Sequence, residues 1–529
     1  MTTGRGSILW EDGRRVLDRS ERDVGMKVVS DLQLDRVLRT VCPDIVLREA
    51  FLSVLVSPCT ESADINGRTA VLRTFRRIPQ LVDTLIETVR HLCTVKNMWD
   101  SDRARIHARR AVNPNDRSEL LWSARESLVQ TAHFIGTANL DIHRLYETLN
   151  MFGCTDGWLG ELRETAFALS ESESSRELRA YADKLERGLL NAHTYEVEFA
   201  IGDDMYTEPY FLRDFSATVV TERVRKKQRL PILSLFERNE RSEEVGRADT
   251  TVAAPPPSVR VSGADLDHCF DTALRAVRET DRYLTSFLRA AIDRLCGLET
   301  ELYFYKAAML YCDWYEERGI GLVYPELREA GENVIDIKSL YDVLLLTESM
   351  SVLSVVPNDV YFCGGRAGGE TAGILITGQN NSGKTVYLRS VGTAVLLAQC
   401  GLPIPCTSAI ISLRRRIFTV FATSEGELQP LSSAGRFEEE VTEIARVVDA
   451  LEPSSLLLMN EIFQTTSYEE GAEGMYHILR YMSSCGCGFL FVTHLMGLIE
   501  AFASDGGVEV LRTCETPRER YKVKRVQNP

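Results

Sequence analysis

The sequence lacks the features that mark membrane-spanning and secreted proteins. Although 44% of its 529 residues are hydrophobic, no apolar run approaches the roughly 18 residues of a membrane-spanning helix. The first residues, MTTGRGSILWEDGRR, have no apolar centre of the kind that secretory signals carry. We therefore expect a cytoplasmic protein with no membrane partner.

Patterns typical of structural metal sites and disulfide frameworks are also missing. The eight histidines form no pair at the spacing of zinc ligands, and the 13 cysteines have no regular spacing. Cys485 and Cys487 form the only close pair, and without a second pair we interpret them as core or loop residues. An odd number of unevenly spaced cysteines indicates reduced thiols.

The chain also lacks the excess of positive charge typical of proteins that coat nucleic acids. Its formal net charge is −15, whereas non-specific nucleic-acid affinity comes from neutralising phosphates. A DNA-binding surface would therefore have to be local. The densest basic cluster consists of Arg223, Arg225, Lys226, Lys227 and Arg229. It is either a set of DNA phosphate contacts or a solvated face that neutralises the acidic segment after it.

A second basic cluster comprises Arg103, Arg105, Arg109 and Arg110, interrupted by Asp102. We interpret it more readily as a solvated helix face than as a DNA contact.

What the sequence does contain is a complete phosphate-binding loop, Gly378-Gln-Asn-Asn-Ser-Gly-Lys-Thr385. It follows the apolar run 373–377 and opens a helical pattern over 386–399, which is the strand–loop–helix context that the motif requires. Glycines allow backbone N–H groups to wrap a phosphate chain, and the helix N-terminus adds partial positive charge. We expect Lys384 to reach the β- and γ-phosphates of ATP and Thr385 to bind Mg²⁺.

Two further apolar runs end in polar residues. Residues 456–459 are followed by Asn460 and Glu461, and residues 489–492 by Thr493 and His494. Because parallel strands bring their carboxyl ends to one edge of a sheet, these side chains should lie beside the bound phosphates. Glu461 is the candidate general base for the attacking water, and His494 could hold that water or sense the γ-phosphate.

The pattern of apolar and polar residues changes several times along the chain. We expect a polar tail over 1–24, helices over 25–193, and a small β element within 194–262 whose end, from 238, is a disordered linker. A long amphipathic helix opens the segment 263–345, and the helical pattern runs on to about Arg318. An α/β pattern follows Gly319 and continues through the last segment, 346–529. The predicted fold class is a mainly α-helical region followed by an α/β phosphate-loop domain.

The order of these motifs resembles the ATPase domain of the MutS family of mismatch-repair proteins. The matching segments are Val356–Asp359, the loop with Asn380, Ser382, Gly383 and Lys384, Arg416–Thr419, Glu440–Glu443, Glu461, Thr466–Ser467 and Thr493–His494. More weakly, Asp64–Arg68 resembles the family's core domain and Phe304–Ala308 its lever helix. The size and the β insertion are similar to those of short bacterial MutS-like proteins that lack the mismatch-recognition domain.

The resemblance implies how the segments work together. Residues 25–193 would be a core domain, 194–262 a clamp-like element, 263–345 lever helices and 346–529 an ABC/RecA-like ATPase domain. ATP would be bound by Gly378 and the run from Asn380 to Thr385, including Asn381, with Mg²⁺ held by Thr385, Asn460 and Glu461. A homodimer would complete each site with a serine from the neighbouring subunit, either Ser432 or Ser433.

The chain departs from the family pattern at informative positions. The aspartate that ends the second strand in the family is Asn460 here, so we expect weaker Mg²⁺ binding and slower ATP turnover. Val355 stands where relatives can place an aromatic residue against adenine. No Phe-x-Glu mismatch wedge occurs in a dedicated N-terminal domain, which favours DNA of unusual structure over a base mismatch as the ligand.

Three functions remain open from the sequence. The first is an ATP-dependent DNA-binding protein of MutS type, in which hydrolysis drives switching of the dimer and its levers. The second, favoured by Asn460 and the negative charge, is a nucleotide-gated scaffold with weak ATPase activity and no DNA role. The third is a hydrolase or kinase that shares only the phosphate loop, against which the Glu461–His494 order argues.

Overall fold

A computed structural model describes most of the chain. The described residues are 7–10, 18–112, 116–192, 194–198, 211–216, 258–262, 266–349, 351–363, 373–422, 433–463, 468–505, 507–514, 516 and 519–526. They form two compact units, each discontinuous in sequence. The first comprises residues 1–8 and 79–302, and the second comprises residues 9–78 and 303–529.

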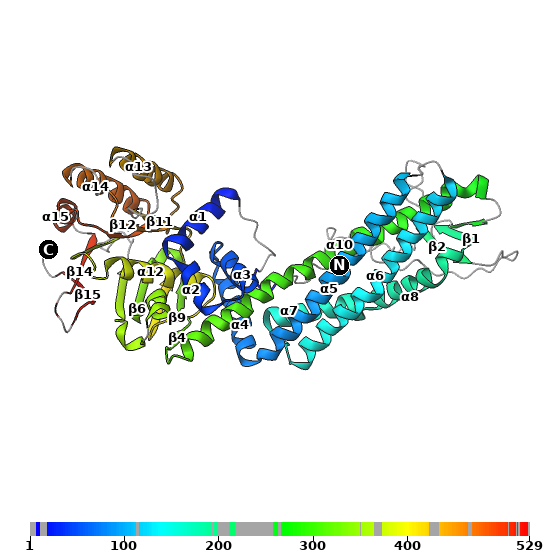
Figure 1. Ribbon diagram of the computed structural model, residues 1–529, viewed down its shortest axis with the longest axis horizontal. Helices are drawn as coiled ribbons and strands as arrows, with labels where there is room; N and C mark the ends of the chain where they lie inside the picture. Colours follow the sequence, from blue (N-terminus) through cyan, green and yellow to red (C-terminus); the bar gives the residue numbers. More distant parts are fainter. Residues whose placement is uncertain are drawn as a thin grey trace, which may run out of the picture. The chain divides into compact units, whose positions relative to one another are not determined.

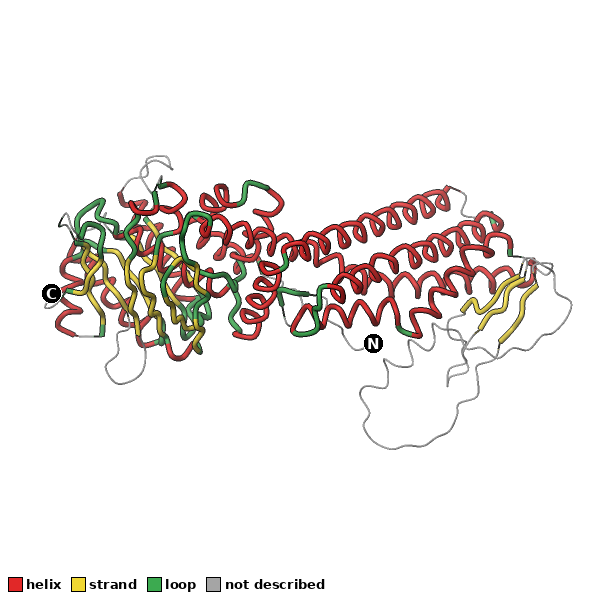
Figure 2. The backbone as a smooth tube through the Cα atoms, turned by 90° about the horizontal axis from the view of Figure 1, so that it is seen from below, coloured by secondary structure: helices red, strands yellow, loops and turns green. Residues whose placement is uncertain are grey.

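The first unit is built from long helices. These are α5 (Pro79–Val112), α6 (Arg117–Met151), α7 (Gly157–Glu171), α8 (Glu173–Gly188) and the part of α10 (Leu266–Glu316) up to Leu302. Helix α6 begins because the Asp116 carboxylate accepts hydrogen bonds from the N–H groups of Ser118 and Glu119. The helices lie side by side in Figure 2, and the Trp99 ring of α5 stacks on Phe134 of α6 with centroids 4.3 Å apart.

A three-stranded antiparallel sheet closes one end of this helical unit (Figure 2). Its strands are β1 (Thr194–Glu198), β2 (Phe211–Ser216) and β3 (Ser258–Ser262), and they are ordered β2-β1-β3. Strand β3 lies where the sequence predicts the end of the disordered linker, so those five residues differ from that prediction. Pairing with β1 explains the difference, because each of the five residues is in antiparallel register with a residue of Thr194–Glu198.

The second unit contains a mostly parallel sheet of order β11-β12-β13-β8-β14-β15, which confirms the predicted α/β class. Only β15 runs antiparallel to its neighbour. The strands are β8 (Gly373–Thr377), β11 (Ile417–Phe421), β12 (Leu456–Asn460), β13 (Gly488–Val492), β14 (Val508–Thr513) and β15 (Val523–Arg525). Four of them are the strands predicted from the apolar runs and from the segment Arg416–Thr419.

Helices cover both faces of this sheet, as Figure 1 shows. They are α12 (Lys384–Gln399), α13 (Ser433–Asp449), α14 (Tyr468–Ser484) and α15 (Met496–Asp505). Successive residues of β12 point to opposite faces, so Leu457 packs in the cluster that contains Met475 of α14, whereas Leu458 lies against α12 at Gly392. Burial on both faces explains why these strands read as continuous apolar runs.

A second sheet in the second unit contains strands from before and after residue 346. Its order is β5-β10-β6-β7, and a short pair, β4-β9, lies in the same unit. The strands are β4 (Leu322–Val323), β5 (Glu326–Arg328), β6 (Val334–Leu340), β7 (Asn358–Cys363), β9 (Ile404–Pro405) and β10 (Ser408–Ser412), and α11 (Val343–Glu348) follows β6. Because β4–β6 pair with strands beyond residue 346, they cannot belong to a separate helical segment over 263–345.

The first four helices also belong to the second unit, which differs from the predicted core domain of 25–193. They are α1 (Arg19–Asp31), α2 (Leu34–Val41), α3 (Ile45–Leu55) and α4 (Ser62–Arg77). The buried Gln399 amide on α12 explains the grouping, since it donates to Cys59 O at 2.7 Å and to Arg414 O at 3.0 Å. Within the predicted tail of 1–24, Trp10 is buried with the Arg68 guanidinium 4.1 Å from its ring centroid.

Among the residues with assigned positions, no helix is both long enough and apolar enough to cross a lipid bilayer.

Candidate functional site

The phosphate loop joins β8 to α12, as the motif predicts, and its backbone conformation depends on glycine. Gly378 has φ +145° and Gly383 has φ +94°, and Gly383 caps α12. A Cβ atom built on Gly378 would lie 1.9 Å from Thr513 Oγ1 of β14. The loop therefore needs glycine at 378 both for its backbone angle and for the close approach of the neighbouring strand.

Lys384 is the most enclosed polar residue of the loop. It is 4% exposed, and its ammonium donates hydrogen bonds to Gly378 O at 3.0 Å and Gln379 O at 2.9 Å. Its Nζ also lies 3.7 Å from Glu461 Oε1. Burial lowers the pKa of Lys384 below its ordinary value, and the Glu461 carboxylate opposes that shift.

Two hydroxyl groups hold the loop against neighbouring strands. Thr385 Oγ1 donates to Asn460 Oδ1 at 2.9 Å, so the residue predicted to bind Mg²⁺ lies beside the residue at the aspartate position. Thr513 Oγ1 donates to Ser382 Oγ at 2.7 Å. The sequence offered no signal for Thr513, because its strand is placed next to the loop only by the sheet.

Glu461 and His494 follow β12 and β13 and come together at the carboxyl edge of the sheet. Glu461 Oε1 lies 3.5 Å from His494 Nε2. The left-handed backbone of Glu461, with φ +54°, turns its carboxylate towards the loop, while its N–H donates to Val492 O at 2.9 Å. His494 Nε2 is buried and has no hydrogen-bond partner in the described part of the chain. This nitrogen is available to a ligand atom placed between the histidine and the loop.

Helix α13 is tied to the turn that carries Glu461. Glu440 of α13 accepts a hydrogen bond of 2.7 Å from the Phe463 N–H, two residues after Glu461. The rings of Phe437 and Phe463 also meet edge to face with centroids 5.5 Å apart. Of the two serines predicted to act in a neighbouring subunit, Ser433 is the first residue of α13, and Ser432 lies outside the described residues.

These residues surround a cavity of about 1070 Å³. Its lining includes most of the predicted ATP-binding set, namely Asn380, Asn381, Ser382, Gly383, Lys384, Thr385, Glu461 and His494. Val355 lines it as well, together with Asn358 from the matching segment Val356–Asp359 and with Tyr521, for which the sequence indicated no role in the site. Asn358 anchors the segment of Tyr521, since it donates to Tyr521 O at 3.1 Å and accepts from Val523 N at 2.9 Å.

The chemistry of the cavity fits a nucleotide phosphate chain with a divalent cation. The Lys384 ammonium is held by two loop carbonyls and lies near Glu461, His494 Nε2 makes no hydrogen bond within the described residues, and the N-terminus of α12 adds partial positive charge. These groups suit anionic oxygens. Thr385 and Asn460 supply neutral oxygen ligands and Glu461 a charged one, which is the donor class that Mg²⁺ prefers.

The predicted basic clusters do not join this site. Residues 223–229, with Arg223, Arg225, Lys226, Lys227 and Arg229, lie outside the described residues. In the second cluster Arg103 pairs with Asp281 at 2.7 Å, Arg105 pairs with Asp102, and Arg109 lies 3.6 Å from Glu126. These pairs involve three of the four arginines of that cluster, and the side chain of Arg110 lies outside the described residues.

Comparison with known proteins agrees with the geometry. Residues 374–523 match the family model described as MutS domain V. The chain is 35% identical over 151 residues to the DNA mismatch repair protein msh-3 of Neurospora crassa, covering 28% of this chain and 13% of that protein. It is 34% identical over 148 residues to DNA mismatch repair protein MutS of Chlorobium chlorochromatii, covering 28% and 16%.

A longer match reaches into the helical region. The chain is 26% identical over 370 residues to DNA mismatch repair protein MutS 2 of Haloarcula marismortui, covering 66% of this chain and 34% of that protein. The matched parts thus span about a third or less of the relatives' own lengths. Residues 374–523 nevertheless carry the phosphate loop, Glu461 and His494 together, and this segment matches MutS domain V, an ABC-type ATPase domain.

Proposed function

We propose that this chain is an ATP-dependent DNA-binding protein of MutS type, in which hydrolysis of ATP resets the conformation of a dimer on DNA. The observation that carries the proposal is that Lys384 Nζ and His494 Nε2 lie 3.7 and 3.5 Å from the same atom, Glu461 Oε1. A carboxylate base (Glu461), a histidine that can donate a hydrogen bond (His494) and an ammonium group (Lys384) beside a phosphate loop suit phosphoryl transfer to water.

Lys384, Glu461 and His494 would each have a separate role in hydrolysis. Lys384 would transfer its hydrogen bonds from Gly378 O and Gln379 O to the β- and γ-phosphate oxygens. Glu461 would take a proton from a water molecule as its oxygen attacks the γ-phosphorus and the bond to the β-phosphate oxygen breaks. His494 would orient that water or the γ-phosphate through Nε2. ADP and inorganic phosphate leave, and the proton passes from Glu461 to phosphate or solvent.

Thr385 and Asn460 would hold Mg²⁺ from one side, with Glu461 nearby. Mg²⁺, when bound, neutralises charge that develops on the phosphate oxygens. A neutral Asn460 attracts the cation less than a carboxylate would, so we expect slow turnover. The family resemblance further implies a homodimer in which Ser432 or Ser433 reaches the partner's nucleotide. The link from Glu440 to Phe463 would couple α13, which begins at Ser433, to the turn of Glu461.

The experiment that tests the proposal measures ATP hydrolysis with branched, mismatched and plain duplex DNA. Stimulation by one DNA form is expected, and Glu461→Ala should reduce turnover by roughly 10²- to 10⁴-fold while ATP binding persists. Glu469→Ala, which removes an exposed carboxylate at the start of α14, is the matched control. Unchanged hydrolysis in Glu461→Ala would show that another residue acts as the base.

A nucleotide-gated scaffold is the second candidate, because Asn460 is neutral and the chain carries a net charge of −15. It predicts tight ATP binding, negligible turnover and no response to any DNA form. The same hydrolysis experiment therefore separates the two functions.

A further inference from the structure

The helical unit contains a second polar cavity, of about 530 Å³, that the nucleotide chemistry does not use. Helices α5, α6 and α10 line it. The charged and polar lining residues are Arg103, His107, Ser123, Ser127, Arg278, Glu279, Asp281, Arg282, Thr285, Ser286 and Arg289. Its four arginines face two carboxylates, so the lining has a surplus of two positive charges in a strongly acidic chain.

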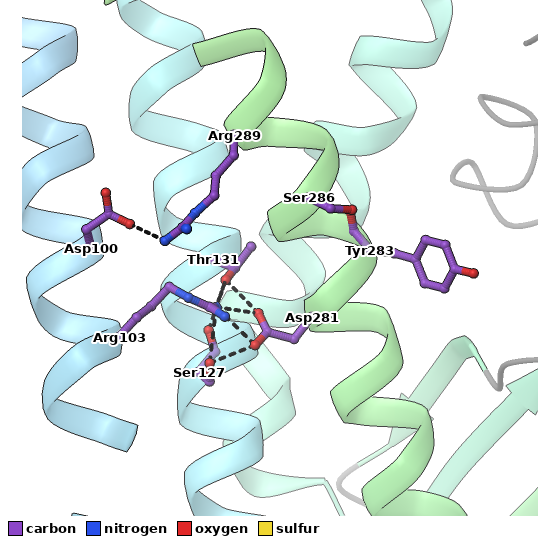
Figure 3. Close-up of polar contacts among 8 residues, drawn as sticks. All are labelled: Asp100, Arg103, Ser127, Thr131, Asp281, Tyr283, Ser286 and Arg289. Atoms are coloured by element: carbon purple, nitrogen blue, oxygen red, sulfur yellow. Dashed lines mark hydrogen bonds and ion pairs between the residues drawn. The ribbon is translucent and has the colours of Figure 1, made fainter. Parts of the chain in front are cut away.

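The floor of this cavity is a closed ion-pair network (Figure 3). Arg103 Nη1 donates to Asp281 Oδ1 at 2.7 Å and to Oδ2 at 3.0 Å. The hydroxyls of Ser127 and Thr131 each donate to Asp281 at 2.7 Å. Asp281 is 7% exposed and would be costly to bury without these partners. Because its charge is already balanced, Asp281 offers little repulsion to an incoming anion.

A second arginine is held at the side of the cavity. Arg289 Nη2 donates to Asp100 Oδ1 at 2.6 Å (Figure 3). The guanidinium carbons of Arg103 and Arg289 lie 5.4 and 5.7 Å from the Trp99 ring centroid. Trp99 itself is fixed by its stack on Phe134. These two arginines are therefore positioned before any ligand arrives, which lowers the entropic cost of binding.

The rim of the cavity is open and basic. The Arg282 side chain is 79% exposed, and its Nη1 lies 3.6 Å from Glu279 Oε2, one turn earlier on the same helix. His107 is also exposed on the rim. Thr285 Oγ1 is buried and has no hydrogen-bond partner within the described ranges, so the cavity wall holds an unused hydroxyl. A loosely held guanidinium beside an unused hydroxyl suits an oxyanion with several acceptor atoms.

The cavity lies next to the three-stranded sheet of the same unit. The Leu212 N–H of β2 donates at 2.9 Å to Thr280 Oγ1, the residue before Asp281. Phe211 of β2 also meets Tyr283 of α10 with ring centroids 4.7 Å apart. We propose that this cavity binds a phosphate group of a nucleic-acid backbone, with Arg282 as the contact that closes over it. The inference rests on the proposed function, since it assigns a contact to the DNA that the chain would bind.

The first test compares DNA binding by the full chain and by single-residue variants over a series of salt concentrations. Arg282→Glu should weaken duplex binding by roughly tenfold and reduce the slope of log affinity against log salt by about 0.9. Arg282→Lys should retain most of the slope. Arg187→Glu is the matched control, because Arg187 is 82% exposed and has one acidic partner on its own helix at 3.8 Å. Equal losses for Arg282→Glu and Arg187→Glu, or no loss for either, would overturn the assignment.

The second test does not depend on DNA binding. Trp99 lies against both arginines, so its fluorescence should change when inorganic tripolyphosphate is added to the full chain in a Lys384→Ala background. Trp99→Phe should remove the change, and Arg282→Glu should weaken it at least fivefold. A response without DNA binding would show a small-phosphate site and refute the proposed DNA function alone. If tripolyphosphate leaves the fluorescence unchanged and Arg282→Glu leaves DNA binding unchanged, the phosphate site itself is rejected.

Discussion

Thr385 Oγ1 donates a 2.9 Å hydrogen bond to Asn460 Oδ1, so the loop hydroxyl is held by the residue that we propose to stand in place of an aspartate. The amide oxygen can accept this bond as well as a carboxylate would. It cannot supply the negative charge that a divalent cation prefers. The geometry of the cation site is therefore kept while its electrostatic attraction is reduced.

Restoring the acid tests this interpretation. Asn460→Asp should lower the Mg²⁺ concentration for half-maximal ATP hydrolysis by roughly tenfold, because one carboxylate strengthens an oxygen-ligand site. The measurement is a Mg²⁺ titration of steady-state turnover. Asn460→Ala, which removes the acceptor of Thr385, should shift the titration in the opposite direction. If the aspartate variant and the natural chain need the same Mg²⁺, Asn460 does not contribute to the cation site.

Nucleotide affinity should depend on the protonation of Lys384. Burial lowers the pKa of Lys384 below 10.5 in the free protein, and a bound polyphosphate would raise it again. At a pH between the pKa of Lys384 in the free protein and its pKa in the ATP complex, ATP binding takes up a proton. The ATP affinity should therefore fall as the pH rises towards 10.5. Calorimetry in two buffers of different ionisation enthalpy would measure the proton uptake. Lys384→Arg stays charged, so its affinity, even if lower, should show no such decline.

Glu461 and His494 should act as a coupled pair. Because Glu461 Oε1 and His494 Nε2 are 3.5 Å apart, the losses of turnover in Glu461→Gln and His494→Asn should not add. A double-mutant cycle on turnover should give a coupling energy of about 0.5–3 kcal/mol. His477→Asn, at an exposed position of α14, should be additive with Glu461→Gln. Additivity of the His494 variant would contradict a shared role.

Gln399 should be essential for the stability of the second unit. Its amide serves Cys59 O and Arg414 O, and its Oε1 accepts from Arg414 N at 2.9 Å. Gln399→Leu would remove these three buried hydrogen bonds and should lower the free energy of unfolding by about 3 kcal/mol. Urea denaturation provides the measurement, with exposed Gln80→Leu as the control. A loss no larger than that of the control would mean that water or a rearranged chain replaces the amide.

Local sequence predicted the central part of the nucleotide unit well. The loop at 378–385 and the strands before Glu461 and His494 carry their own signals, because apolar runs and glycine spacing are short-range patterns. Strand β3 was missed because a five-residue segment after a proline run, Ser258–Ser262, becomes a strand only when β1 offers a partner.

Long-range relationships could not be read in the same way. Nothing near Thr513 or Tyr521 indicates that the sheet places them beside the phosphate loop. The association of α1–α4 with the second unit depends on Gln399, more than 300 residues further along the chain. Periodicity identifies a helix and its apolar face, but the partner of that face is set by the tertiary fold.

The division of strands and helices between segments far apart in the chain has a practical consequence for dissecting the protein. A fragment cut out at residue 346 would lose β4–β6 and the four N-terminal helices together. Strands β7, β9 and β10 would then keep unpaired edges, which favour aggregation over folding. The smallest autonomous nucleotide-binding piece would therefore be a splice, in which residues 9–78 are rejoined to residues 303–529.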